Sequence, residues 1–333
     1  MTNSSDKGNK PRITVVIPAY KVAKHILGLL NNIGPEVTRI IVVDDGCPEK
    51  SGNLVLKECA DKRIKVLFHP ENLGVGASVI SGYREALREG CDVIIKLDGD
   101  GQMNPALIPR MILPVLDGQA DYSKGNRFFN VTKVKSMPLG RIIGNLALSF
   151  FAKASSGYWN IFDPNNGYTA INSKVVGQLP LERISTRYFF ESDMLFHLNL
   201  MRAVVIDVPM DAKYGDETSN LRLVDSVFEF AFKHMRNYFR RITYGYYLRD
   251  FTLASIELPL GSALCIFGFV VGLKSWIHSM NDGIPTQPGT LILIAMSFLS
   301  GLQLLLGFFA FDISNTPREP ISKFLPNVAQ NTL

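Results

Sequence analysis

The chain has 333 residues, 47% of them hydrophobic, and a formal net charge of +5 at pH 7. This length is enough for one enzymatic domain of ordinary size and a short membrane region. Outside one helix next to that region, the basic residues form no patch with interleaved aromatics, which argues against a nucleic-acid partner. The four cysteines and five histidines lack the spacing of a zinc site, so we expect reduced thiols in a cytoplasmic domain.

The amino-terminal half of the chain alternates apolar runs with helical patterns. After a polar segment, residues 1–11, that we expect to be a disordered tail, buried strands are predicted at residues 12–18, 39–46, 65–68 and 91–97. Helical segments are predicted between them, at residues 22–31, 52–60 and 79–89. Strands that alternate with helices predict an α/β fold with a doubly wound, mostly parallel sheet.

Three of the predicted strands end in residues suited to ligand binding. They lead into Pro18-Ala19-Tyr20, Asp44-Asp45 and Asp98-Gly99-Asp100. In open parallel sheets, ligands bind beyond the carboxyl ends of the strands. We therefore expect these three strand ends to converge on one cleft.

The last of these strand ends is the most informative. Asp98 and Asp100 are two residues apart, and Gln102 adds a carboxamide. The glycines between them allow tight turning and close approach to a ligand. In an extended chain, the alternation of side chains would put both carboxylates on the same side. Oxygen ligands of this kind suit Mg2+ or Mn2+, and these ions suit a diphosphate, so the sequence predicts a metal-dependent site for a nucleotide-linked substrate.

Four motifs occur in an order that resembles a known family. They are Ile17-Pro18-Ala19-Tyr20, Val43-Asp44-Asp45-Gly46, Glu71-Asn72-Leu73-Gly74 and Leu97-Asp98-Gly99-Asp100-Gly101-Gln102. The set resembles the inverting family 2 glycosyltransferases. Within that family it is most similar to the polyprenyl-phosphate branch, which includes dolichol-phosphate mannose synthases and bacterial polyprenyl-phosphate glucosyltransferases. The resemblance implies a GT-A-like catalytic domain over residues 12–225.

The resemblance also implies roles on the donor side of the cleft. The implied donor-binding residues are Pro18, Ala19, Tyr20, Asp44, Asp45 and Asp98, together with Lys213 from a loop that closes over the donor. Asp100 and Gln102 would hold a Mg2+ or Mn2+ ion that bridges the donor phosphates and offsets charge on the departing nucleoside diphosphate. For one member of the Asp44-Asp45 pair, a helix cap or a solvated loop end is the alternative interpretation.

Further motifs match the acceptor side of the family. Gly125-Asn126-Arg127-Phe128 resembles its acceptor motif, and Arg141 and Asn145 follow at the spacing of further acceptor-phosphate contacts. Asn145 stands where the mannose synthases have Ser. The segment Asp163-Pro164-Asn165-Asn166-Gly167-Tyr168 resembles another family motif, and Glu191-Ser192-Asp193 is a candidate to line the same cleft.

Among the residues that the resemblance implies, Asp163, Arg127 and Arg141 are the catalytic candidates, and the chemistry of a phosphate acceptor suggests their roles. A phosphomonoester has a second pKa of about 6, so at pH 7 it is mostly anionic and needs alignment more than deprotonation. Arginine suits that task because its planar fork donates hydrogen bonds in pairs. We therefore assign Arg127, Arg141 and Lys213 to positioning, and keep Asp163 as a candidate base or organiser.

The carboxyl-terminal part of the chain predicts a membrane anchor. Residues 226–250 have an amphipathic pattern that suits a helix in the headgroup layer, with a core helix as the alternative. Two transmembrane helices are predicted within residues 251–312, at about 253–277 and 290–311, although the first could be part of a buried soluble hairpin. Residues 313–333 would form a cytoplasmic tail. Lys and Arg flank this hairpin but are absent from residues 275–289, so the positive-inside rule puts both termini in the cytoplasm.

These patterns together predict a membrane-anchored inverting enzyme. It would move a hexose from a nucleotide-diphosphate sugar to a polyprenyl phosphate, undecaprenyl or dolichyl, on the cytoplasmic face. UDP-glucose is the first expectation for the donor and GDP-mannose the second, and a bacterial inner membrane is favoured over the endoplasmic reticulum. One alternative is a glycan acceptor, although this sequence lacks the Gln-x-x-Arg-Trp motif of the family's processive synthases. The other alternative is a noncatalytic nucleotide-sugar-binding membrane protein. The sequence leaves open whether the protein forms a homo-oligomer.

Overall fold

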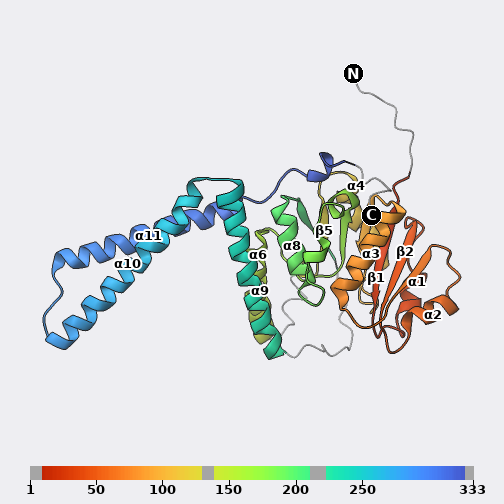
Figure 1. Cartoon of the computed structure of the whole chain (residues 1–333), viewed down its shortest axis with the longest axis horizontal. Coiled ribbons are helices and arrows are strands. Elements are labelled where there is room, and N and C mark those ends of the chain that lie inside the picture. The colour runs from red at the N-terminus through yellow and green to blue at the C-terminus, as the bar shows by residue number, and fades with distance from the viewer. Residues whose placement is uncertain (1–9, 130–138, 211–222, 327–333) are drawn as a thin grey trace, which may run out of the picture. The chain divides into compact units, whose positions relative to one another are not determined.

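The computed structural model describes residues 10–129, 139–210 and 223–326 (Figure 1). The chain divides into two compact units. The first unit consists of Met1–Tyr238 and Pro317–Leu333, and the second unit is Phe239–Thr316. The second unit is therefore inserted into the sequence of the first.

The amino-terminal part of the sheet is parallel. Strands β1 (Ile13–Ala19), β2 (Arg39–Asp45), β3 (Ile64–His69) and β4 (Val93–Lys96) lie in the order β3-β2-β1-β4, and each pairs in parallel with its neighbour. Helices α1 (Ile26–Asn31), α2 (Ser51–Glu58) and α3 (Val75–Glu89) connect them. This arrangement confirms the predicted α/β class with a mostly parallel sheet.

The other part of the sheet contains one strand of opposite direction. Strand β6 (Thr169–Asn172) lies antiparallel between β4 and β5 (Tyr122–Asn126), and β7 (Val205–Pro209) pairs in parallel with β5. In the described part of the chain, the sheet order is β3-β2-β1-β4-β6-β5-β7. Further helices of the first unit are η1 (Pro105–Leu107), α4 (Ile108–Leu116), α6 (Leu139–Ser156), α7 (Ser173–Val176), η2 (Leu181–Arg183), α8 (Phe190–Leu200) and η4 (Ile321–Lys323).

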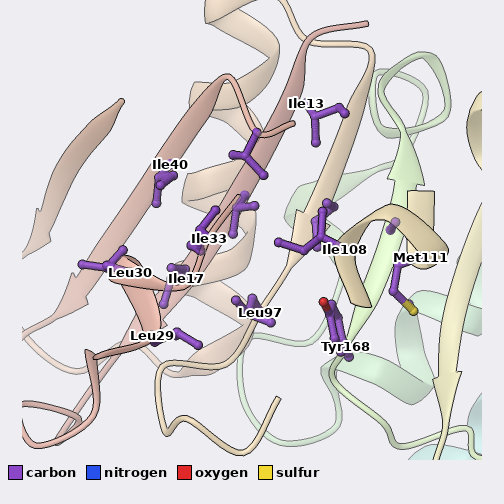
Figure 2. Close-up of a cluster of buried hydrophobic side chains, with 14 of the residues drawn as sticks. Ile13, Ile17, Leu29, Leu30, Ile33, Ile40, Leu97, Ile108, Met111 and Tyr168 are labelled. Atoms are coloured by element: carbon purple, nitrogen blue, oxygen red, sulfur yellow. The ribbon is translucent and has the colours of Figure 1, made fainter. Parts of the chain in front are cut away.

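Apolar side chains cover both faces of this sheet. Figure 2 shows a first core cluster, to which β1 contributes Ile17, α1 contributes Leu30 and α4 contributes Ile108. A second core cluster combines Val16 of β1 with side chains of α3 and α8, among them Tyr83. Neighbours such as Val16 and Ile17 enter different clusters because successive strand residues point to opposite faces. Each fully buried Val or Ile side chain contributes about 1.5–3 kcal/mol, so the two clusters hold the strand ends in fixed positions.

Helix α9 begins at Leu223 and ends at Thr243, and up to Tyr238 it belongs to the first unit. Its inner face is held by polar contacts. His234 Nδ1 lies 2.7 Å from Ser155 Oγ, and Asn237 Nδ2 donates to Asp193 Oδ1 at 2.8 Å. The opposite face exposes the large apolar side chains Phe228, Phe232 and Met235. The helix is amphipathic, as its pattern predicts, and its position in the headgroup layer stays a prediction.

After the second unit, the chain returns to the sheet. Ser322 N and Ile321 N donate to the carboxylate of Asp121 at 2.8 and 2.9 Å, and Val204 N donates to the same carboxylate at 2.8 Å. Asp121 is fully buried just before β5. Ile321 and Leu325 also pack against the second core cluster. One carboxylate thus holds three backbone amides, two of which lie on the far side of the inserted unit in the sequence.

The second unit contains two long helices, α10 (Leu253–Asp282) and α11 (Pro288–Ser314), which lie side by side (Figure 1). By length and composition, both could cross a membrane. Small residues let them approach closely, since a Cβ atom on Gly261 would lie 3.0 Å from the carbonyl oxygen of Gly301. The pair confirms the predicted hairpin as a candidate membrane anchor. Each helix extends beyond the predicted residues 253–277 and 290–311.

The buried carboxylate of Asp312 links the first and the last part of this unit by hydrogen bonds. Arg241 donates to both carboxylate oxygens of Asp312, at 2.6 and 2.9 Å. Tyr246, in a π-helical turn (Tyr244–Arg249) that follows α9, donates its hydroxyl to the same carboxylate at 2.6 Å. The carboxyl end of α9 is therefore fixed to the carboxyl end of α11.

Candidate active site

The first part of the site is the loop after β4. The strand ends at Lys96, so Asp98 and Asp100 lie beyond it and strand alternation does not set their sides. Asp98 is 30% exposed and accepts a hydrogen bond from Lys96 Nζ at 2.6 Å. Asp100 Oδ1 accepts the backbone N–H of Gln102 at 2.9 Å. Gly101 has a φ of +77°, a left-handed conformation that favours glycine, and so permits this tight turn.

The oxygen ligands of this loop fit a metal ion shared with a substrate. Within the described ranges, no group of three or more His, Cys, Asp or Glu side chains converges as a closed metal cage requires. Asp98, Asp100 and Gln102 instead offer partly exposed carboxylate and carboxamide oxygens. Mg2+ usually keeps several waters and binds through one or two carboxylates plus substrate phosphates. The residues present match that kind of site, and the assignment of Asp100 and Gln102 to the ion stays a prediction.

Asp44 and Asp45 end β2 and are both buried. Asp44 accepts backbone N–H bonds of 2.8 Å from the turn after β2 and of 2.6 Å from the first turn of α2. Asp45 accepts bonds of 3.0 and 2.8 Å from the backbone before α3, and its Oδ1 lies 2.7 Å from His69 Nδ1. Both carboxylates therefore hold the backbone of neighbouring loops, Asp44 that of the loop after β2 and Asp45 that of the loop before α3. The contact of Asp44 with α2 fits the helix-cap alternative, and the donor role of the pair stays a prediction.

The predicted nucleobase turn follows β1. Pro18 and Ala19 are the last residues of the strand, whereas Tyr20 beyond its end is 40% exposed. Lys21 has a φ of +56°, and its Nζ lies 5.5 Å from the centroid of the Tyr20 ring. An exposed ring at a strand end can stack on a planar base. Contact between this turn and the donor stays a prediction.

The second part of the site lies beyond β5. Arg127 follows the last residue of the strand and donates to both carboxylate oxygens of Asp163, from Nε at 2.7 Å and from a terminal nitrogen at 3.1 Å. The Asp163 side chain is 3% exposed, and the Arg127 side chain is 37% exposed. Asp163 thus holds the guanidinium from the buried side. With both oxygens engaged by a cation, Asp163 fits the organiser role better than the role of a base.

Aromatic side chains follow Arg127 and precede Asp163 in the chain. The ring centroids of Phe128 and Phe162 are 6.2 Å apart, and Lys153 Nζ lies 5.3 Å from the centroid of Phe162. One turn before Lys153 on α6, the Phe150 ring lies 5.9 Å from that of Trp159. Phe150 and Phe162 are each 55% exposed. The exposed rings of Phe129 and Phe162 therefore lie close in the chain to the two members of the Arg127–Asp163 pair. The sequence signal for such rings is the run of aromatics just before Asp163.

Three predicted site residues have side chains that are not described. Arg141 and Asn145 belong to helix α6, but their side chains lie outside the described residues. Lys213 lies outside the described residues altogether. Of the predicted acceptor-phosphate set, Arg127, Arg141 and Asn145, the structure describes the side chain of Arg127 alone, and the roles of all three residues and of Lys213 on the donor side stay predictions.

Two buried lysines near the site were not predicted to be functional. Lys96 of β4 and Lys124 of β5 are both almost completely buried. Burial lowers the pKa of Lys124 to about 8. Burial acts in the same direction on Lys96, but the carboxylates of Asp98 and Glu191 outweigh it and raise its pKa. Their sequence signal is a lysine within a strand, because a buried ammonium is costly unless it is paired.

The chain is similar to several known proteins. The family described as Glycosyl transferase family 2 matches residues 14–179. The UDP-N-acetylglucosamine–dolichyl-phosphate N-acetylglucosaminyltransferase of Methanococcus voltae is 29% identical over 219 residues, with 61% of this chain and 86% of that protein covered. The undecaprenyl-phosphate mannosyltransferase of Micrococcus luteus is 29% identical over 204 residues, with 60% and 82% covered. An uncharacterized protein of Methanocaldococcus jannaschii is 31% identical over 213 residues, with 62% and 84% covered.

A likeness to solved structures extends these matches to the fold. The glucosyl-3-phosphoglycerate synthase from Mycobacterium tuberculosis, in complex with Mn2+, UDP and glucosyl-3-phosphoglycerate, gives a TM-score of 0.52 at 17% identity. The comparison covers 69% of this chain and 80% of that one. At such low identity the likeness shows the fold alone, and it confirms the predicted GT-A-like architecture.

Proposed function

Because the chain belongs to Glycosyl transferase family 2 and is a glycosyltransferase, we propose that it transfers a sugar from a nucleotide-diphosphate sugar to a polyprenyl phosphate at a membrane. The observation that carries this proposal is the guanidinium of Arg127, which is held by Asp163, together with the exposed aromatic rings of Phe129 and Phe162 close to these two residues in the chain. Such a combination suits an acceptor with an anionic head and an apolar body. The names of two relatives, which specify dolichyl-phosphate and undecaprenyl-phosphate acceptors, support it.

The donor half of the proposed site follows β1 and β4. Tyr20 would stack on the nucleobase, Asp98 would bind the nucleoside, and Asp100 and Gln102 would hold a Mg2+ or Mn2+ ion. When bound, such an ion supplies positive charge that offsets the negative charge on the departing diphosphate. The loop residues themselves orient the donor so that its anomeric carbon faces the acceptor half of the site.

The acceptor half of the proposed site needs no proton transfer from the enzyme. A phosphomonoester is mostly anionic at pH 7, since its second pKa is about 6. One of its oxygens attacks the anomeric carbon, the new carbon–oxygen bond forms, and the bond to the diphosphate breaks in the same displacement, with inversion. Arg127 aligns the phosphate, and Asp163 fixes the plane of the guanidinium. Arg141, Asn145 and Lys213 are proposed to assist in this alignment.

We also propose that the hairpin anchors the enzyme with the sheet on the cytoplasmic side. The residues before and after the hairpin belong to the same folded unit, which requires both flanks to lie on one side of the membrane. Lys and Arg occur in these flanks but not in residues 275–289 between the two spans, which supports the cytoplasmic side. The named relatives come from bacteria and archaea, which favours a prokaryotic cell membrane over the endoplasmic reticulum.

The sugar is the least constrained part of the proposal. We propose a hexose, with UDP-glucose as the first donor to test and GDP-mannose as the second. The names of the relatives specify N-acetylglucosamine and mannose transfer, so UDP-N-acetylglucosamine joins the panel.

The test is a transfer assay with the purified full-length protein in detergent. The protein would be incubated with Mg2+ or Mn2+, undecaprenyl or dolichyl phosphate and each labelled nucleotide sugar, and label entering the organic phase would be counted. We expect transfer from one donor, lost on chelation of the metal and restored by adding it back. Donor binding without transfer to either lipid would refute the proposed acceptor and favour a glycan acceptor. Binding of no nucleotide sugar would refute the donor half as well.

A further inference from the structure

A polar row crosses the sheet at the edge of the second core cluster. Lys96 of β4 is the register partner of Thr169 of β6, which is in turn the partner of Lys124 of β5, and Lys124 is the partner of Asp207 of β7. Register partners on neighbouring strands point to the same face of a sheet. The four side chains therefore lie in one row, on the face that α3 and α8 cover.

The two lysines of this row hold consecutive carbonyl groups of one loop. Lys96 Nζ donates to the carbonyl of Gly167 at 3.3 Å, and Lys124 Nζ donates to the carbonyl of Asn166. This loop also carries Asp163, the partner of Arg127, and Asn166 Nδ2 donates to Asp163 at 3.4 Å. The two lysines thus set the position of the loop that orients the acceptor arginine.

Lys96 also reaches the donor half of the site. Besides the Gly167 carbonyl, its ammonium contacts Asp98 Oδ1 at 2.6 Å and Glu191 Oε1 at 3.1 Å. Because the Lys96 side chain is 1% exposed, solvent contributes almost nothing to its charge balance. The position of Asp98 is therefore tied to the same ammonium that holds the acceptor loop.

Glu191 acts on both lysines. It lies in the first turn of α8, its side chain is 13% exposed, and it pairs directly with Lys96. Its charge also acts favourably on the ammonium of Lys124, with which no direct pair forms within the described residues, and the charges of Asp163 and of the register partner Asp207 act in the same direction. A buried cation is stable only with a compensating anion nearby, so loss of this one carboxylate weakens the hold of both ammoniums.

We propose that Lys96, Lys124 and Glu191 form a positioning unit that fixes the position of the donor half of the site relative to the acceptor half. Lys96 orients Asp98, Lys124 orients the loop of Asp163, and Glu191 compensates both charges. This inference rests on the proposed function, because the two halves are defined by the donor and the acceptor. None of the three side chains is required to touch the substrates.

The test measures binding at each half separately. Full-length protein in lipid nanodiscs would be titrated with UDP or GDP in the presence of Mn2+, and separately with undecaprenyl phosphate. The variants are Lys96→Met, Lys124→Met and Glu191→Gln, each with its unfolding temperature measured. The matched control is Lys65→Met, because Lys65 also pairs with two glutamates, Glu85 and Glu89, but lies on the edge strand β3.

Each variant has its own expected signature. Lys96→Met should raise the Kd of the nucleotide about tenfold and that of the lipid phosphate less, whereas Lys124→Met should do the reverse. Glu191→Gln, which is isosteric, should raise both constants. In the double variant Lys96→Met/Glu191→Gln, the effects should be less than additive, because the two residues share one interaction.

Three results would overturn the inference. The first is an equal change of both constants in Lys96→Met and in Lys124→Met. The second is changes no larger than those of Lys65→Met. The third is a lower unfolding temperature with both constants unchanged, which would indicate a purely structural role. If the wild type binds the nucleotide but not undecaprenyl phosphate, the proposed acceptor is refuted. The inferred effect of Lys124 on acceptor binding is then refuted as well. Binding of both ligands without transfer would refute the activity alone.

Discussion

Replacing Arg127 by lysine separates the geometry of this side chain from its charge. Lysine keeps the positive charge but loses the planar fork, which donates to both oxygens of Asp163 at 2.7 and 3.1 Å. Asp163 is buried, and removing its partner altogether would leave an uncompensated buried charge, at a cost of about 3–5 kcal/mol. Because Arg127→Lys keeps a cation next to Asp163, we expect the variant to remain folded.

The expected defect lies in the use of the acceptor. A hydrogen bond to a charged group contributes about 1.5–3 kcal/mol. The Arg127 side chain is 37% exposed, so solvent screening puts the loss at the lower end of that range. A loss of about 1.5 kcal/mol corresponds to about a tenfold rise in the KM for the lipid phosphate. The affinity for the nucleotide should stay nearly constant, because the proposed donor residues follow β1 and β4 rather than β5.

The assay is the initial rate of transfer at varied undecaprenyl phosphate, together with the Kd of the nucleoside diphosphate from calorimetry. A matched control is Arg63→Lys. Arg63 also donates to both oxygens of one carboxylate, that of Asp61, but it lies just before the edge strand β3. An equal loss of acceptor use and nucleotide binding in Arg127→Lys would refute the reasoning. The same KM change in Arg63→Lys would also refute it.

Three further predictions concern other parts of the molecule. Asp100→Asn should abolish transfer without lowering the unfolding temperature, and near-normal activity would remove Asp100 from the metal site. Asp121→Ala leaves three backbone amides without their acceptor, so it should lower stability by at least about 2 kcal/mol and expose residues 317–326 to limited proteolysis. Burial raises the pKa of Asp207 to about 6, because it favours the protonated side chain in the folded protein. The free energy of folding gained in this way is complete below the ordinary pKa of 3.8 and is lost as the pH rises through 6. Asp207→Asn, which mimics the protonated form, should therefore raise the unfolding temperature at pH 7.5, and this gain should vanish at pH 4; a gain of equal size at both values would contradict the assignment.

The parallel part of the fold could be predicted because the local pattern and the tertiary environment agree there. Strands β1 and β2 are runs of Val and Ile that end in Pro18-Ala19 and in Asp44-Asp45, and both are buried on two faces. Strands β5 and β6 carry no such signal. β5 contains Ser123 and Lys124, β6 has only four residues, and both are buried through contacts that a local pattern does not contain.

The candidate site residues were named from motifs and their roles stay predictions, whereas the partners that the structure gives them could not be predicted. Asp163 follows Arg127 by 36 residues, and the pair forms because β5 and the segment before β6 meet in the sheet. The sequence left two interpretations open for the acidic pair after β2, since a carboxylate at a strand end can serve either a ligand or loop amides. The structure shows that Asp44 and Asp45 both accept bonds from loop amides. Lys96 has the position of an ordinary strand residue, and only the fold reveals the carboxylates around it.

The contacts of Asp121 also bear on the order in which the protein can be made. The amides of Ile321 and Ser322 follow the hairpin in the sequence, so the ribosome completes both long apolar helices before these partners of Asp121 exist. Domains generally fold from the amino terminus during synthesis, yet this unit cannot satisfy its buried carboxylate until the hairpin is finished. The proposed insertion of the hairpin into a membrane can therefore begin while the sheet still lacks its last native contacts.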